Sequence, residues 1–224
     1  MRDACLDAVG RLASVADRWL VVGADPLVGP GPDPRTGRPG RRTLDGAGYG
    51  SFIGFGVDVR VSLTPEPGGR PRSDLPLPVL IAGWLRGQAA GRVSATAELV
   101  DPALPPRECE RAGAELAGRL EPGTAVLVVG DGAATHTDKA PGYLDERAGP
   151  FDADVSRALA GGDPAGLRAL DPVLATELHA IGRAPWQVLA GLAAATGARW
   201  EGELLYSDAP YGVAYHVASW RRAG

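Results

Sequence analysis

Residues 125–152 read AVLVVGDGAATHTDKAPGYLDERAGPFD, and this stretch decides the fold. The five apolar residues at its start, 125–129, are typical of a parallel strand that is buried on both faces. Open α/β sheets bind ligands outside the carboxyl ends of such strands, which is where the glycine-rich loop from Gly130 begins. We therefore expect any chemistry to centre on this loop, although Gly-Asp-Gly is also a common solvated turn.

Helices and strands alternate on both sides of this stretch. Upstream, apolar spacing predicts helices over 2–18, 76–86 and 106–120, and strands over 19–23, 57–63 and 93–100. Downstream, it predicts short helices over 151–159, 164–170, 172–181 and 186–196, followed by β segments over 199–206 and 212–220. The order indicates an α/β fold with a largely parallel central sheet flanked by helices and a C-terminal β-hairpin.

The length and composition indicate a single domain over residues 1–224. With 224 residues, of which 45% are hydrophobic, the chain can bury one good core. Two segments, about 24–50 and 64–74, are dense in Gly, Pro and Arg, so we expect mobile loops that hold no packed element. The arginines of 35–42 could meet an anionic ligand, but a solvated insertion is the favoured interpretation.

The charge of the chain disfavours several kinds of partner. A net charge of −4 and a pI near 5.4 provide no basic surface for nucleic acid or an anionic membrane. No apolar run is long enough to span a bilayer, and no signal peptide precedes the first helix. The two cysteines, Cys5 and Cys109, give neither a disulfide framework nor a CxxC spacing, so a reduced, cytoplasmic setting is expected.

Few residues could carry acid–base or metal chemistry, because the chain has only three histidines. His136 lies in the glycine-rich loop and is the best catalytic candidate, since imidazoles exchange protons near neutral pH. An exposed loop histidine remains the alternative. We expect His179 to cap the C-terminus of its helix and His216 to face the surface of its strand. No Gly-x-Ser-x-Gly elbow or phosphate-binding glycine motif is present.

Three segments carry a family resemblance. They are GDGAATHTDKAPGYLDERAGPFDADV at 130–155, ALAGGDPAGLRALDPVLATELHAIGRAPWQVLAGL at 158–192 and ELLYSDAPYGVAYHVASW at 203–220. In order and spacing they resemble the class III extradiol ring-cleavage dioxygenase family, in its small actinobacterial branch. The resemblance implies an oxidoreductase with an α/β fold. In active members it implies a mononuclear Fe(II) that binds a catechol and O2 before the ring opens.

The resemblance also identifies positions where this chain departs from active relatives. One histidine ligand normally lies in a Pro-His-Pro-like motif before the first helix, and here that helix follows Met1 directly. The second ligand position is replaced by a stretch in which Asp25 is the only donor, and His179 is the donor nearest the third. The family's acid/base histidine aligns with Ala134, and His136 follows two residues later.

Two hypotheses about function arise from these departures. As an enzyme, the chain would use His136 as acid/base, Asp131 and Lys139 to orient the loop, and His179 with Asp25 as remaining ligands of Fe(II). As a metal-free, inactive member, it would hold a small aromatic molecule or a partner segment in the same crevice. The absence of the first strand would expose a sheet edge, which favours a homo-oligomer.

Overall fold

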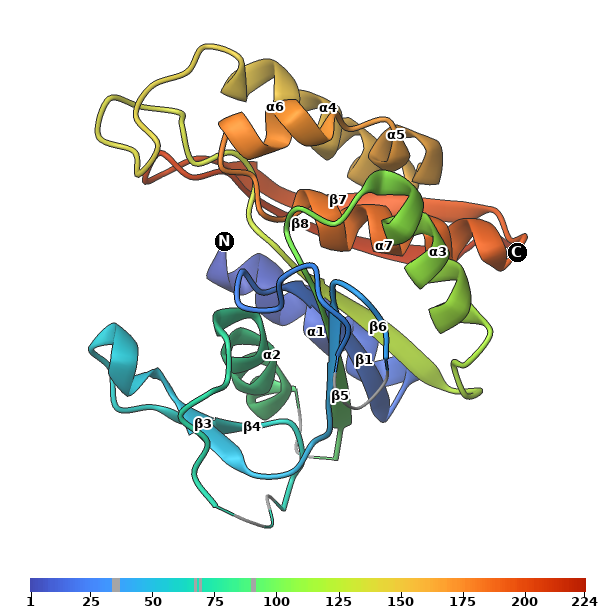
Figure 1. Cartoon of the computed structure of the whole chain (residues 1–224). Helices are drawn as coiled ribbons and strands as arrows, with labels where there is room; N and C mark the ends of the chain where they lie inside the picture. Colours follow the sequence, from blue (N-terminus) through green and yellow to red (C-terminus); the bar gives the residue numbers. More distant parts are fainter. Residues whose placement is uncertain (34–36, 67, 69, 90–91) are drawn as a thin grey trace. The chain divides into compact units, whose positions relative to one another are not determined.

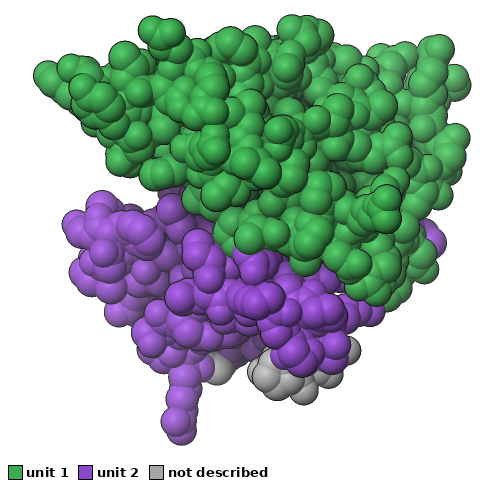
Figure 2. All heavy atoms as spheres, turned by 45° about the horizontal axis from the view of Figure 1, so that its top comes forward, with its two compact units in different colours: residues 1–4, 102–120, 130–224 green, residues 5–101, 121–129 purple. Residues whose placement is uncertain are grey.

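The computed structural model describes the whole chain except residues 34–36, 67, 69 and 90–91 (Figure 1). The chain forms two compact units, coloured separately in Figure 2, and each is described by itself. Unit 1 contains residues 1–4, 102–120 and 130–224, and unit 2 contains residues 5–101 and 121–129. That residues 1–224 act as one domain stays a prediction.

Unit 2 contains the central sheet, whose strand order is β2-β5-β1-β6. Three strands are parallel, and the fourth pairs antiparallel at the edge. The bounds are β1 (Arg18–Ala24), β2 (Arg41–Leu44), β5 (Ser94–Val100) and β6 (Thr124–Val129). The predicted α/β fold with a largely parallel sheet is therefore confirmed.

Helices α1 (Arg2–Val15), which belongs to unit 2 from Cys5 onward, and α2 (Leu77–Gln88) share a core with this sheet. Trp19 and Val21 from β1 are 2% and 0% exposed, and Val79 of α2 packs in the same cluster. Each such large side chain contributes about 1.5–3 kcal/mol when it leaves water. A small sheet of β3 (Tyr49–Ser51) and β4 (Arg60–Ser62), joined through the 3-10 turn η1 (Phe52–Phe55), completes the unit.

The expectation that residues 24–50 hold no packed element is wrong. Strand β2 lies in that segment and pairs with β5. The reason is electrostatic: the guanidinium of Arg41 donates to Glu98 Oε1 at 2.7 Å, and Thr43 donates to Glu98 Oε2 at 2.9 Å. A buried arginine fits a strand when a carboxylate of the neighbouring strand faces it. Residues 34–36, 67 and 69 of the two predicted loops lie outside the described residues.

Unit 1 is built from helices and a hairpin. Its elements are α3 (Pro106–Ala117), α4 (Ala148–Gly161), α5 (Pro164–Arg168), α6 (Pro172–Glu177), α7 (Arg183–Ala195), β7 (Trp200–Asp208) and β8 (Tyr215–Arg222). Helices α3 and α7 pack closely at Gly113. A Cβ atom on this residue would lie 2.1 Å from the carbonyl oxygen of Val188. Only glycine permits this approach of two backbones. None of the helices in the described ranges is long and apolar enough to cross a membrane.

The predicted C-terminal hairpin is confirmed as β7 paired with β8, and α4 runs along it in Figure 1. Trp220 of β8 donates from Nε1 to the carbonyl oxygen of Leu159 at 2.7 Å, which fixes the hairpin to α4. A bulge between Leu204 and Tyr206 shifts the register, so that Ser207 stands directly opposite His216. Bulges re-aim the side chains that come after them, and here a hydroxyl is placed beside an imidazole.

Candidate functional site

The loop that follows β6 is held by backbone hydrogen bonds within unit 1. The amide of Ala134 donates to the carbonyl oxygen of Leu178 at 2.9 Å, at the end of α6. On the other side, His136 N donates to Gly212 O at 3.1 Å, and Ala214 N donates to Ala133 O at 2.9 Å. The loop is thus fixed between a helix end and the start of β8, although its composition is that of a solvated connection.

Asp152 is the centre of the polar cluster that this loop forms. It lies in the first turns of α4 on the buried face that also carries Phe151 and Val155, and it is 6% exposed. One carboxylate oxygen, Oδ2, lies 2.6 Å from His136 Nε2, and the other, Oδ1, lies 3.1 Å from His216 Nε2. The amide of Ala133 adds a further donor at 3.2 Å from Oδ2.

These contacts define the ring tautomers that an ionised Asp152 would select. An ionised carboxylate only accepts hydrogen bonds, so both Nε2 atoms carry hydrogen toward Asp152 when it is ionised. In each neutral ring the Nδ1 atom then has a free lone pair. His136, whose side chain is 19% exposed, makes no hydrogen bond through Nδ1 to the described residues. It can therefore accept a proton from a bound molecule.

The second ring connects the carboxylate to the surface. His216 Nδ1 lies 2.9 Å from the hydroxyl oxygen of Ser207, which is exposed, whereas the His216 side chain is 2% exposed. The ring of Trp186 on α7 meets the His216 ring edge to face, with centroids 6.1 Å apart. The expectation that His216 faces the surface is therefore wrong, because the hairpin face that carries it packs on α4. The row of hydrogen-bonded groups from His136 through Asp152 and His216 to Ser207 is called the relay below.

Asp131 and Lys139, expected to orient the loop, lie outside the relay. Asp131 accepts a hydrogen bond from Gly182 N through its backbone oxygen at 2.9 Å, and burial raises the pKa of its carboxyl. Lys139 is exposed and makes no hydrogen bond or ion pair with the described residues. The orienting group for His136 is Asp152.

The candidate metal ligands are not brought together within either unit, since Asp25 belongs to unit 2 and His179 to unit 1. Asp25 is buried, accepts from Leu27 N at 3.0 Å and faces Arg42 at 4.0 Å. His179 follows α6 with a positive φ of 55°, and Ala180 N donates to Ala175 O at 2.8 Å. This is the left-handed helix ending that a C-terminal capping position requires.

The relay could have been found in part from the sequence. Asp152 lies at helical spacing among Phe151, Val155 and Leu159, so a charge falls on the apolar face of its helix. A carboxylate in such a position needs partners. Ser207 and His216 could not be paired from the sequence, because their register depends on the bulge in β7.

The residues of the relay do not fit Fe(II). In the part of the chain that the structure describes, no group of three or more His, Cys, Asp or Glu side chains could hold a metal ion. His136, Asp152 and His216 do meet, but both rings direct Nε2 at the carboxylate instead of at a common centre. A metal would have to displace both hydrogen bonds.

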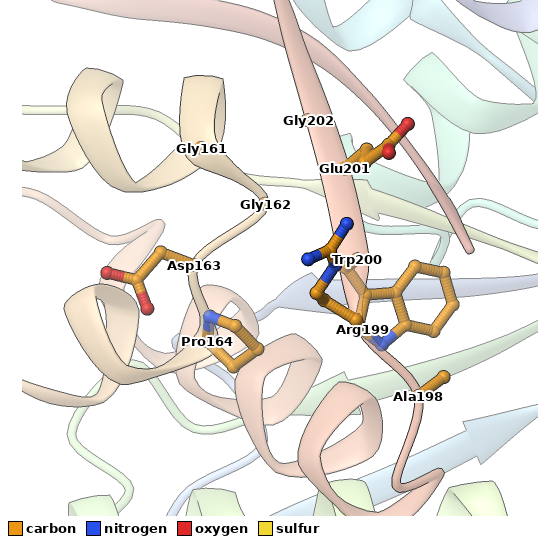
Figure 3. Close-up of a pocket in the computed structure, with 9 residues that line it drawn as sticks. All are labelled: Gly161, Gly162, Asp163, Pro164, Ala198, Arg199, Trp200, Glu201 and Gly202. Carbon is orange, nitrogen blue, oxygen red and sulfur yellow. The ribbon is translucent and has the colours of Figure 1, made fainter. Parts of the chain in front are cut away.

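A separate hollow of unit 1 lies near the start of β7 (Figure 3). It is lined by the end of α4, the start of α5 and the beginning of β7, and includes Asp163, Arg199 and Glu201. Asp163 caps α5 by accepting from Ala165 N at 2.9 Å. No residue of the relay lines this hollow, so we do not assign the site there.

Comparisons with known proteins give the fold alone. Neither protein-family models nor curated protein sequences match the chain. Among solved structures, the chain is similar to the uncharacterized protein JW3007 from Escherichia coli K12, with a TM-score of 0.54 and 13% sequence identity. The match covers 96% of this chain and 91% of that chain. It supports the α/β fold class described above.

Proposed function

We propose that unit 1 carries an acid–base site, centred on His136, that binds and ionises a small phenolic molecule. The observation that carries the proposal is the 2.6 Å contact between His136 Nε2 and Asp152 Oδ2. Asp152 orients the ring and stabilises the positive charge that forms when Nδ1 takes a proton. A hydroxyl group placed at Nδ1 would thereby become its anion.

A phenolic ring is the favoured substrate class for two reasons. The segments that carry His136 and its backbone partner Gly212 also expose three large side chains, Tyr143, Leu144 and Tyr211, which are 67%, 51% and 78% exposed. Such side chains contact aromatic rings well. The resemblance to extradiol dioxygenases independently implies a catechol.

The proposal ends at binding and ionisation of the ring. Oxidative opening of a catechol, the activity that the resemblance implies, requires iron, and the described residues contain no group of three or more His, Cys, Asp or Glu side chains that could hold it. The second hypothesis, that a small aromatic molecule is held without turnover, shares the same site and differs only in the fate of the molecule after it has bound.

The test is a titration of the full-length protein with 4-nitrocatechol, whose visible absorption changes when it ionises. We expect the protein to increase the anion absorption at a pH where the free probe is mainly protonated, and His136→Gln to abolish this increase. His179→Asn is the matched control, since asparagine tolerates the positive φ and the residue lies outside the relay. It should behave as the wild type.

Two results would contradict the proposal. One is an unchanged ionisation of the probe in His136→Gln. The other is anaerobic binding of one Fe(II) ion per chain that His179→Asn abolishes. This result would support the hypothesis of an iron-dependent enzyme in which His179 is a ligand.

A further inference from the structure

We infer that Ser207, His216 and Asp152 form a nucleophilic site that hydrolyses small carboxylic esters. This activity goes beyond the proposed function and does not involve His136. The hydroxyl of Ser207 lies 2.9 Å from His216 Nδ1, and His216 Nε2 lies 3.1 Å from Asp152 Oδ1. A nucleophile, a base within hydrogen-bonding distance and a third group that orients the base are the arrangement that activates a serine.

The direction of the protons agrees with this role. In the tautomer in which His216 Nε2–H donates to the carboxylate, Nδ1 is the acceptor and the Ser207 hydroxyl donates to it. In this tautomer the hydroxyl proton points at the base that would remove it. Asp152 also accepts from Ala133 N, so its carboxylate is fixed independently of His216.

The nucleophile is open to solvent, whereas the base and the group that orients it are buried. Ser207 is exposed and can meet a substrate, whereas the side chains of His216 and Asp152 are 2% and 7% exposed. The edge-to-face contact with Trp186 restricts rotation of the His216 ring. A base whose position is fixed before the substrate arrives loses little entropy in the reaction.

Two other serines, Ser156 and Ser14, are bound differently. The hydroxyl of Ser156 donates to Ala153 O at 3.1 Å, and that of Ser14 donates to Arg11 O at 2.7 Å. Both hydroxyls point at backbone carbonyls, which cannot take up a proton. Ser156 lies on α4, the helix that also carries Asp152, and is therefore a matched control.

The reaction balances without a redox partner. Ser207 Oγ attacks the ester carbonyl carbon while its proton moves to His216 Nδ1. The C–O bond to the alcohol then breaks, and the alcohol leaves with that proton, so an acyl-serine remains. Water attacks the acyl carbon and gives a proton to Nδ1. The bond to Oγ breaks, and Ser207 regains its hydrogen as the carboxylic acid leaves.

The test is reaction of the full-length protein with a fluorophosphonate, followed by intact mass and peptide mapping. We expect one adduct, on Ser207, in the wild type and in Ser156→Ala, and none in Ser207→Ala. Ser207 is exposed, so its replacement should leave the circular dichroism spectrum and melting unchanged. His216→Gln should slow labelling about 100-fold or more, the usual contribution of a general base.

Hydrolysis of p-nitrophenyl acetate provides the second measurement, with the same ranking of variants. A wild type that is not labelled, or equal labelling of Ser207→Ala, would overturn the inference. His136→Gln should still be labelled although it loses ionisation of 4-nitrocatechol. The two proposals can therefore fail separately.

Discussion

Unit 2 and unit 1 each bury a carboxylate, and the two are used differently. Glu98 of unit 2 faces Arg41, and their side chains are 2% and 4% exposed. Asp152 of unit 1 faces two imidazoles, and through His216 it reaches the exposed Ser207. The guanidinium keeps its charge at every ordinary pH, whereas an imidazole can gain or lose a proton. A buried carboxylate thus fixes a strand in one case and prepares a chemical site in the other.

The largest effect should come from removing the carboxylate of unit 2. Glu98→Ala leaves the Arg41 guanidinium buried without its carboxylate, which costs about 3–5 kcal/mol of unfolding free energy. Urea denaturation followed by circular dichroism measures this loss. Glu121→Ala is the control, because its ion pair with Arg18 is exposed and should contribute below about 1 kcal/mol. Equal losses of unfolding free energy in the two variants would mean that the buried Arg41–Glu98 pair stabilises the fold no more than an exposed ion pair does.

The next effect separates the two carboxylates by function. Asp152→Asn places an amide against two ring N–H groups and the Ala133 amide, so we expect a loss of about 1–3 kcal/mol in the same denaturation experiment. Both probe reactions, with 4-nitrocatechol and with fluorophosphonate, should also disappear. Asp154→Asn, on the exposed side of the same helix, should keep them. If Asp152→Asn retained both reactions, Asp152 would be as purely structural as Glu98.

The smallest effect concerns Asp131, a partly buried carboxyl of unit 1 outside the relay. Because burial raises its pKa in the folded protein, the ionised form is disfavoured there. Its contribution to stability is present at low pH and is lost as the pH rises through the folded-state pKa. Asp131→Asn should therefore be more stable than the wild type at pH 7, and the gap should close below about pH 4, where unfolded aspartate is protonated. Thermal melts across this range measure the gap, and a gap independent of pH would refute the assignment.

Much of the fold could be predicted from the sequence because local patterns determine it. The apolar run of β6 and the helical spacing of α2 and α7 are visible without any partner. Strand β2 was not predictable in this way, since its buried arginine is compatible with a strand only when Glu98 of β5 stands opposite. That pairing joins residues 57 positions apart.

The site was predictable only at His136, whose loop comes after an apolar strand. Its orienting carboxylate lies 16 residues further along, and His216 lies 64 residues beyond Asp152, so neither contact leaves a spacing pattern. Lys139 and Asp131 were attractive because they are close in sequence to His136. Proximity along a loop does not determine which side chains turn toward one another, and here a helix supplies the partner instead.

The division of the chain into its units has a consequence for synthesis on the ribosome. The chain leaves unit 2 for unit 1 over residues 102–120 and returns to unit 2 over residues 121–129. It then enters unit 1 again with residues 130–224. The central sheet lacks its edge strand β6 until residue 129 has emerged from the ribosome. Helix α3 likewise lacks its close neighbour α7 until residue 195 has been made. Because each unit is built from more than one segment of the chain, no single proteolytic cut would release either unit intact.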